Sequence, residues 1–291
     1  MVVEIVRHCN DEVIEWKWSS DNELLPSPFW TACFVVDGLL IDSGAPGGTE
    51  DLREFVESLD EEEAVKKCVI THSHEDHAGG GHMLKHELGI PVYASKEGIR
   101  LLLKEKEYPD YRKLTWGKHY QPFKAQGVEN PLKTPSGKFE FEILEMPGHA
   151  SDLITLIERE QQWAFTTDAV MPKYQMVFDV EDIPEDISRV YTSIKSLHEY
   201  TEGMDELKIF TSGRGIFEGR CFLKKKMEEI EHLHEGAHRY LKEGQEKGLK
   251  KRKLMKFLLK EMFGGESFVG KFTRGDLSSK NLIQSLLEWP L

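Results

Sequence analysis

The sequence predicts an α/β fold made of two similar halves and followed by a helical region. Three observations lead to this prediction: strand-like and helix-like runs alternate, the alternation repeats, and helical periodicity takes over from Cys221 onward. Short apolar runs bounded by turn residues are typical of strands, whereas apolar residues three and four positions apart indicate a helix face. We therefore expect one domain over residues 1–218 and a helical region over residues 219–291.

The first half begins with short strands. Asp37-Gly38 separates two apolar runs, and both residues tolerate the positive φ of a tight hairpin turn, so a hairpin is expected there. Residues 49–59 place Leu52, Phe55 and Val56 on one helical face. The expected strands of this half are 2–6, 13–18, 33–36, 39–41 and 67–71.

The second half repeats the pattern. Its expected strands are 139–146, 153–158, 163–167 and 207–211, and its expected helix is 186–200, whereas the strand 90–94 and the helix 95–106 belong to the first half. Residues 108–131 are aromatic and polar and have no clean periodicity. The sequence therefore assigns no element to that stretch.

The C-terminal region reads as helices. Apolar residues at helical spacing recur between Leu223 and Leu241, and two further apolar faces cover residues 254–262 and 281–287. The lysine-rich runs at 224–226 and 250–253 are interpreted as solvated helix faces. A basic patch that binds RNA is the alternative reading of these runs.

Composition limits the class of protein. The chain has 291 residues, of which 39% are hydrophobic, so it can bury a core and is too apolar for intrinsic disorder. Its 38 lysines and arginines against 51 aspartates and glutamates give a net charge of −13, which argues against nucleic-acid binding driven by overall charge. No apolar run approaches the roughly 20 residues that span a bilayer, and no leader pattern opens the chain. We expect no membrane partner and a cytoplasmic location.

The four cysteines are scattered. Cys9, Cys33, Cys68 and Cys221 form no C-x-x-C pair. A disulfide framework and a thiolate zinc site are therefore not expected.

A histidine cluster directly follows the expected strand at 67–71. His72 and His74 point the same way in extended backbone, because side chains alternate with period two, so they can share one metal ion. Asp76 and His77 lie further round the turn and can face a second ion. The small residues 78–80 allow close approach of the next helix. Imidazole and carboxylate ligands suit Zn²⁺, with Fe and Mn as alternatives.

Two more candidate ligands follow later strands. His149 comes after the expected strand at 139–146, and Asp168 comes after the one at 163–167. Alone, each would be an ordinary turn histidine or helix-capping aspartate. With the cluster, His149 supplies a third nitrogen for the first ion, and Asp168 supplies a carboxylate able to bridge two ions.

These residues resemble the metallo-β-lactamase superfamily, through H-x-H-x-D-H at residues 72–77 with the later His149 and Asp168. The resemblance covers about residues 1–218 and implies an αββα four-layer sandwich. By the family pattern, His72, His74 and His149 hold the first metal, Asp76 and His77 the second, and Asp168 lies between them. Asp42 matches an acidic position of the family that is usually structural.

One position departs from the family pattern. The second site usually closes with a histidine in a Gly-His-Gly turn, and here the matching turn reads Gly213-Arg214-Gly215. Arginine stays protonated and has only donors, so Arg214 cannot be an ordinary metal ligand. If the second site stays empty, we expect the guanidinium to replace the missing positive charge and to hold an anionic group of the substrate or an oxyanion. His198, and the pair His234 and His238, are spare imidazoles that we expect to pack or face solvent.

The expected chemistry is hydrolysis. A metal held by imidazoles lowers the pKa of its bound water to about 7, and Asp76 can orient this nucleophile and move its proton. The resemblance implies one or two Zn²⁺ ions per chain and a small-molecule ester, thioester or lactone substrate, as in glyoxalase II. A β-lactamase-like endoribonuclease or other phosphodiesterase, with RNA as partner, is one alternative. A degenerate, non-catalytic metal-binding member is the other.

Overall fold

A computed structural model of the chain describes residues 2–23, 25, 28–105, 107–180 and 184–291. These residues form two compact units. Unit 1 comprises Met1–Glu145, Ser151–Asp168 and Glu206–Phe217, and unit 2 comprises Met146–Ala150, Ala169–Asp205 and Glu218–Leu291. The expected first domain, residues 1–218, thus contains two segments whose contacts lie mainly within unit 2.

The first sheet of unit 1 is antiparallel at its beginning and parallel at its end. Its strand order is β1-β2-β3-β4-β5-β6-β7, and the direction changes at β4, which pairs in parallel with β5. The expected Asp37-Gly38 hairpin joins β3 to β4, and Asp37 has a positive φ of 46°. The strands are β1 (Val2–His8), β2 (Val13–Ser19), β3 (Trp30–Val36), β4 (Leu39–Ile41), β5 (Lys67–Ile70), β6 (Val92–Ala94) and β7 (Gln126–Gly127).

The second sheet of unit 1 has the order β14-β13-β11-β10-β9-β8. The central strands β9, β10 and β11 are antiparallel, and β11 and β13 run in parallel. Its strands are β8 (Leu132–Lys133), β9 (Glu140–Glu145), β10 (Ile154–Glu158), β11 (Trp163–Thr167), β13 (Lys208–Thr211) and β14 (Ile216–Glu218).

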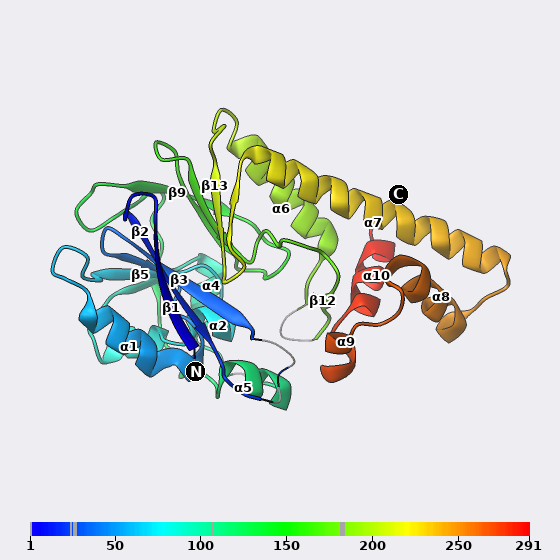
Figure 1. The fold of residues 1–291 in the computed structure, drawn as a ribbon, viewed down its shortest axis with the longest axis horizontal. Coiled ribbons are helices and arrows are strands. Elements are labelled where there is room, and N and C mark those ends of the chain that lie inside the picture. Colours follow the sequence, from blue (N-terminus) through cyan, green and yellow to red (C-terminus); the bar gives the residue numbers. More distant parts are fainter. Residues whose placement is uncertain (1, 24, 26–27, 106, 181–183) are drawn as a thin grey trace. The chain divides into compact units, whose positions relative to one another are not determined.

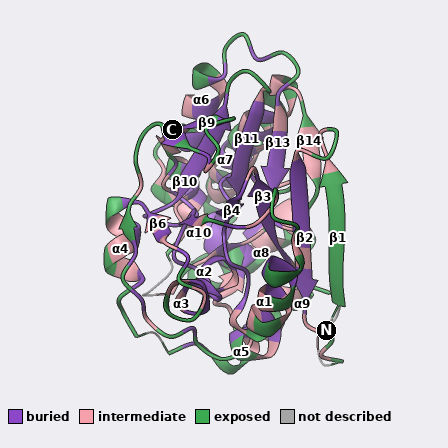
Figure 2. Cartoon of the chain, turned by 90° about the vertical axis from the view of Figure 1, so that its left-hand side faces the viewer, coloured by how far each residue is buried: buried purple, intermediate pink, exposed green. Residues whose placement is uncertain are grey.

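The two sheets enclose an apolar core. Residues along each strand alternate between two faces, and the inner faces of both sheets are apolar. Phe34 of β3 lies 5.3 Å from Phe165 of β11 between ring centroids, and Phe165 stacks on Phe210 of β13 at 4.3 Å. The next residue, Val35, points to the other face, where it packs with residues of the helices. Figure 2 shows β3, β4, β11 and β13 as buried strands and the edge strand β1 as exposed.

Helices cover the outer face of the first sheet. Leu52 of α1 and Leu84 of α3 belong to the same buried cluster as Val35 and Leu40. Figure 1 shows these short helices beside the first sheet. The helices are α1 (Thr49–Ser58), α2 (Glu75–Ala78), α3 (Gly81–His86), α4 (Lys96–Leu101) and α5 (Asp110–Trp116), with a 3₁₀ turn, η1 (Pro46–Gly48). Helix α5 lies in the stretch to which the sequence assigned no element.

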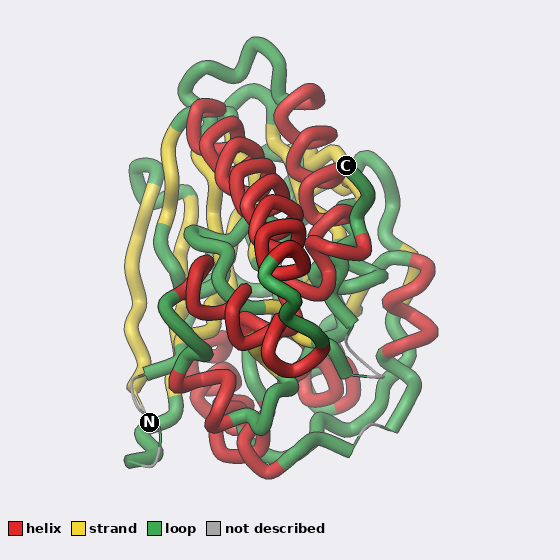
Figure 3. The backbone as a smooth tube through the Cα atoms, turned by 90° about the vertical axis from the view of Figure 1, so that its right-hand side faces the viewer, coloured by secondary structure: helices red, strands yellow, loops and turns green. Residues whose placement is uncertain are grey.

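Unit 2 is mainly helical, as Figure 3 shows, and α7 is its longest described helix. Helix α6 packs against α7, α7 against α8, and α10 against all three. Side chains of Asp186 and Ser278 cap the N-termini of α6 and α10, and Gly264 ends α8 with φ 74°. The elements are β12 (Val177–Phe178), α6 (Ile187–Tyr200), α7 (Arg220–Glu246), α8 (Lys251–Phe263), α9 (Phe268–Phe272), β15 (Leu277–Ser278) and α10 (Ser279–Glu288). The expected C-terminal helices are confirmed.

None of the helices formed by the described residues combines the length and the apolar character that crossing a bilayer requires.

Candidate metal centre

The loop between β5 and α2 carries the histidine cluster, and hydrogen bonds hold its backbone. The Thr71 carbonyl accepts from Ile154 N at 3.0 Å, which ties the loop to β10 of the second sheet. Ser73 N donates to Asp152 Oδ2 at 2.8 Å. His72 and His74, on either side of Ser73, are both buried. The loop therefore presents two imidazoles from a backbone that is fixed at both sheets.

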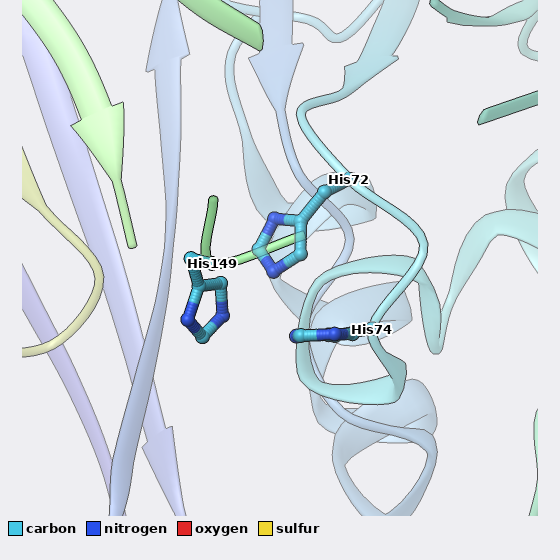
Figure 4. A group of neighbouring side chains, drawn as sticks. All are labelled: His72, His74 and His149. Carbon is cyan, nitrogen blue, oxygen red and sulfur yellow. The ribbon is translucent and has the colours of Figure 1, made fainter. Parts of the chain in front are cut away.

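Two overlapping groups of side chains could each hold a metal ion. The first consists of His72, His74 and His149, and all three are buried. One ligand atom from each lies within 4.8 Å of the others, and Figure 4 shows the three rings around a common space. These are the three residues that the sequence predicted for the first ion.

The second group consists of His72, His77 and Asp168, also within 4.8 Å of one another. His77 Nε2 lies 3.5 Å from Asp168 Oδ2 and 3.7 Å from Asp76 Oδ2. His72 thus belongs to both groups. The family pattern assigned His72 to the first ion alone, whereas in the structure His72 also lies near the ligands of the second ion.

A buried aspartate orients His77. Asp42 Oδ2 lies 2.6 Å from His77 Nδ1, and both side chains are fully buried. Asp42 also accepts from Thr71 N at 2.7 Å and from Thr71 Oγ1 at 2.9 Å. With Nδ1 engaged by the carboxylate, His77 presents Nε2 toward Asp76 and Asp168. Asp42 occupies the structural position that the resemblance implied.

A glutamate orients His149 in the same way within unit 2. Glu185 Oε1 lies 2.5 Å from His149 Nδ1. The other carboxylate oxygen of Glu185 accepts from Phe178 N at 3.1 Å, which fixes the acid in turn. Sequence reasoning missed Glu185, because an acid 36 positions from the histidine has no local signal that links the two.

Burial and nearby charges shift the pKa values of the neighbouring residues Asp76 and His77. Burial raises the pKa of Asp76, and the charges of Glu75 and Asp168 raise it further against the opposing effect of His77. Burial would lower the pKa of His77, but the carboxylates of Asp42, Asp76 and Asp168 outweigh it and hold this pKa well above its ordinary value. The imidazole therefore sits where a positive charge is strongly favoured.

The donor set fits a divalent cation. His77 Nε2 is buried, and the two carboxylates that face it lie 3.5 Å and 3.7 Å away, which is too far for a strong hydrogen bond. A buried polar atom of this kind normally has a partner, and a metal ion would supply one. Imidazole nitrogens with one or two carboxylate oxygens are ligands that Zn²⁺ accepts. The side chains present thus fit the metal that the sequence predicted.

Backbone strain marks the approach to Asp168. Thr167 has a φ of 46°, which is unfavourable for a β-branched residue and costs roughly 1–3 kcal/mol. Its hydroxyl lies 3.1 Å from Thr71 Oγ1, and its carbonyl accepts from Ser212 N at 3.4 Å. These contacts hold the strained residue and place Asp168 at the end of β11.

The glycines after the cluster allow a close backbone approach. A Cβ on Gly79 would lie 2.3 Å from Pro46 N, and Gly79 N donates to Gly44 O at 2.8 Å. Gly79 thus packs against the loop that leads into η1, and any side chain at position 79 would displace this loop.

Arg214 lies on a turn that is anchored beside the second group. Ser212 Oγ lies 3.4 Å from Thr31 Oγ1 and accepts from Ala32 N at 3.2 Å, and Thr31 Oγ1 donates to Asp76 O at 2.5 Å. Gly213 has a φ of 63°, and a Cβ there would meet the Trp30 backbone at 2.7 Å. The side chain of Arg214 is exposed. It belongs to neither ligand group among the described residues.

The spare histidines have other surroundings. His234 and His238 each place Nε2 about 3 Å from the Trp289 carbonyl, at 2.9 and 3.0 Å. His198 lies on α6, where burial and the nearby Arg220 lower its pKa. None of the three enters a metal-binding group formed by residues in the described part of the chain.

A family model described as the metallo-beta-lactamase superfamily matches residues 31–201, more than half of the chain. The chain belongs to this superfamily. The matched range contains both ligand groups and ends before Arg214.

Two curated relatives of this superfamily member are named hydroxyacylglutathione hydrolase. It is 33% identical over 155 residues to hydroxyacylglutathione hydrolase GloC of Haemophilus influenzae, which covers 51% of this chain and 71% of that protein. It is 24% identical over 102 residues to hydroxyacylglutathione hydrolase of Bdellovibrio bacteriovorus, which covers 35% of this chain and 33% of that protein.

Solved structures of metallo-beta-lactamases share the fold. The enzyme from Pontibacter korlensis matches with a TM-score of 0.60 at 18% identity, over 78% of this chain and 98% of that one. FIM-1 from Pseudomonas aeruginosa in its mono-zinc form matches with a TM-score of 0.59 at 16% identity, over 80% and 96%. The metallo-β-lactamase fold predicted from the sequence is thereby confirmed, with helices at the C-terminal end.

Proposed function

We propose that this superfamily member is a metal-dependent hydrolase of acyl compounds, with a thioester as its substrate and an ester or lactone as close variants. The observation that carries the proposal is the pair of ligand groups that share His72, with Asp76 beside them. The relatives named hydroxyacylglutathione hydrolase favour a thioester within the wider acyl class.

The metal would be held by the residues already described. His72, His74 and His149 would bind one ion, and His77 with Asp168 and Asp76 would bind a second if it is present. Zn²⁺ is proposed, because imidazole and carboxylate suit it, with Fe or Mn as alternatives. A bound divalent ion would lower the pKa of a water and polarise the acyl carbonyl oxygen.

Asp76 is the proposed catalytic carboxylate. Its side chain is 14% exposed, whereas those of His77 and Asp168 are 0% and 9% exposed, so Asp76 is the most open of the three. Burial and the neighbouring negative charges raise its pKa, which suits a group that accepts a proton from the attacking water and returns it to the leaving thiol. The Thr31 hydroxyl, bound to the Asp76 carbonyl, keeps its backbone in place.

Arg214 is proposed to bind an anionic group of the substrate. The guanidinium is exposed, and its turn is tied through Ser212 and Thr31 to the backbone of Asp76. A planar, permanently charged fork suits a carboxylate or phosphate better than a metal. The substrate would therefore carry a negative charge at some distance from its acyl bond.

A panel of substrates tests the proposal. Protein reconstituted with zinc should hydrolyse an anionic acyl thioester, and Asp76→Asn should lower kcat by about 100-fold or more, since positioned acid–base groups contribute about 10²–10⁴. Asp60→Asn, at an exposed position after α1, is the matched control. Zinc-loaded protein that hydrolyses no thioester, ester or lactone would overturn the proposal.

The endoribonuclease and non-catalytic alternatives remain predictions from the sequence. The basic run at 250–253 is exposed, as an RNA-binding surface requires, but an exposed run is equally typical of a solvated helix face. The thioester hypothesis has relatives in its favour and is therefore preferred.

A further inference from the structure

A buried ion pair lies inside the metal-binding loop and is not part of either ligand group. Glu75 stands between His74 and Asp76 at the start of α2 and is 1% exposed. Arg112 of α5, 4% exposed, donates to it through two nitrogens: Nε to Oε1, and Nη2 to Oε2 at 2.5 Å. Parallel hydrogen bonds of this kind fix both the distance and the plane of the carboxylate.

The segment that carries Arg112 is fastened to the same loop elsewhere. Tyr120 OH donates to the Ser73 carbonyl at 3.3 Å, and the Arg112 guanidinium lies 5.4 Å from the ring centre of Tyr108. A Cβ on Gly117 would lie 2.6 Å from Gly47 N, so the segment also touches the backbone beside η1. Residues 108–120 thus contact the ligand loop at Glu75 and at Ser73, although no ligand of either group comes from them.

Stability alone does not require a charged pair at this place. Removing two charges from water is costly, and replacing a buried pair by apolar side chains of similar volume is often neutral or stabilising. An apolar pair would not fix the orientation of the side chain at position 75, because apolar contacts are non-directional. The guanidinium fork sets the angle of Glu75, and Glu75 is covalently flanked by His74 and Asp76.

We propose that Glu75 and Arg112 are a positioning pair, which holds the start of α2 so that His74 and Asp76 keep the geometry needed to bind metal. This inference rests on the proposed metal-dependent function. Arg112 acts through Glu75 and needs no contact with substrate. The contact spans 37 positions of sequence and couples α5 to the ligand loop.

The test replaces the pair without leaving a buried charge. The variant Glu75→Leu/Arg112→Met keeps apolar bulk on both sides, and Glu142→Leu/Arg159→Met makes the same exchange at an exposed pair as the matched control. Zinc affinity is measured by competition with a chromophoric chelator, and the visible spectrum of the Co²⁺-loaded protein reports the ligand geometry.

We expect the buried double variant to fold with a Tm close to that of the wild type, to bind zinc about 10–100-fold more weakly, and to show a shifted Co²⁺ spectrum. The control should match the wild type in Tm, in zinc affinity and in the Co²⁺ spectrum. Wild-type zinc affinity and an unchanged Co²⁺ spectrum in the buried double variant would overturn the proposal.

Arg112→Lys serves as the second variant in case the double variant does not fold. It keeps the charge and removes the fork, so zinc should bind more weakly than in the wild type, and unchanged affinity would count against positioning. These readouts are independent of catalysis. A wild type that binds zinc but hydrolyses nothing would overturn the proposed function while leaving the positioning result intact.

Discussion

Asp42 Oδ2 lies 2.6 Å from His77 Nδ1, and both side chains are fully buried. The same carboxylate accepts two hydrogen bonds from Thr71. One acid therefore fixes the end of β5 and the direction of a metal-binding imidazole, which links stability of the fold to geometry of the site.

Asp42→Asn should lower both the stability of the fold and the affinity for zinc. An amide cannot accept all three hydrogen bonds, so we expect a loss of about 1–3 kcal/mol in unfolding free energy and zinc affinity about 10–100-fold lower. Thermal unfolding and zinc titration measure the two effects. Asp37→Asn, in the hairpin turn between β3 and β4, is the control and should change stability by less than about 0.5 kcal/mol. Equal behaviour of the two variants would contradict the role given to Asp42.

The raised pKa of His77 predicts a pH-dependent stability in protein stripped of metal. Its proton stabilises the fold fully below the ordinary imidazole value of about 6.5, and this contribution disappears as pH rises through the raised value. The Tm of stripped wild type should therefore fall toward that of His77→Gln above about pH 6.5. A Tm difference that stays constant across this range would be inconsistent with the expectation, and His86→Gln on α3 is the control.

Arg214→His should restore the histidine of the family turn. We expect the metal content to rise toward two ions per chain and KM for an anionic substrate to increase, because the cationic fork is lost. Arg214→Ala separates the effects: KM should rise while the metal content stays as in the wild type. A wild type that already binds two ions would refute the idea that Arg214 replaces a metal charge.

Trp289 should matter for unit 2 and not for the metal. Its ring stacks on His234 at 4.2 Å and lies 5.1 Å from Tyr191, and its carbonyl faces both His234 and His238. Trp289→Ala should lower stability by about 1–3 kcal/mol, since large-to-small changes at packed aromatic sites are costly. The zinc content should not change. A loss of zinc without a loss of stability would instead point to metal binding by these histidines.

Local patterns were sufficient for most of the fold. The alternating runs predicted β3, β9 and β11 to within a few residues, because burial on one or both faces leaves a period-two or continuous apolar signal. The helical stripe after Cys221 predicted α7 for the same reason. Helix α5 was missed, since its seven residues are too few to establish a period.

The site was predictable to the extent that its ligands are clustered. His72 to His77 are adjacent in sequence, and His149 and Asp168 follow strands, where the superfamily pattern expects ligands. Glu185 and Arg112 were not predictable, because each reaches its partner only through the fold, across 36 and 37 positions. Residues that orient ligands have no required spacing, and a single sequence therefore does not reveal them.

Metal content measured with and without His72 tests the central claim most directly, because His72 belongs to both ligand groups. Elemental analysis of wild-type protein purified without chelator should find at least one divalent ion per chain, and His72→Ala should retain almost none. His82→Ala, on α3 outside both groups, should keep the wild-type content. A wild type without metal, or a His72→Ala variant that binds as much metal as the wild type, would contradict the proposed centre.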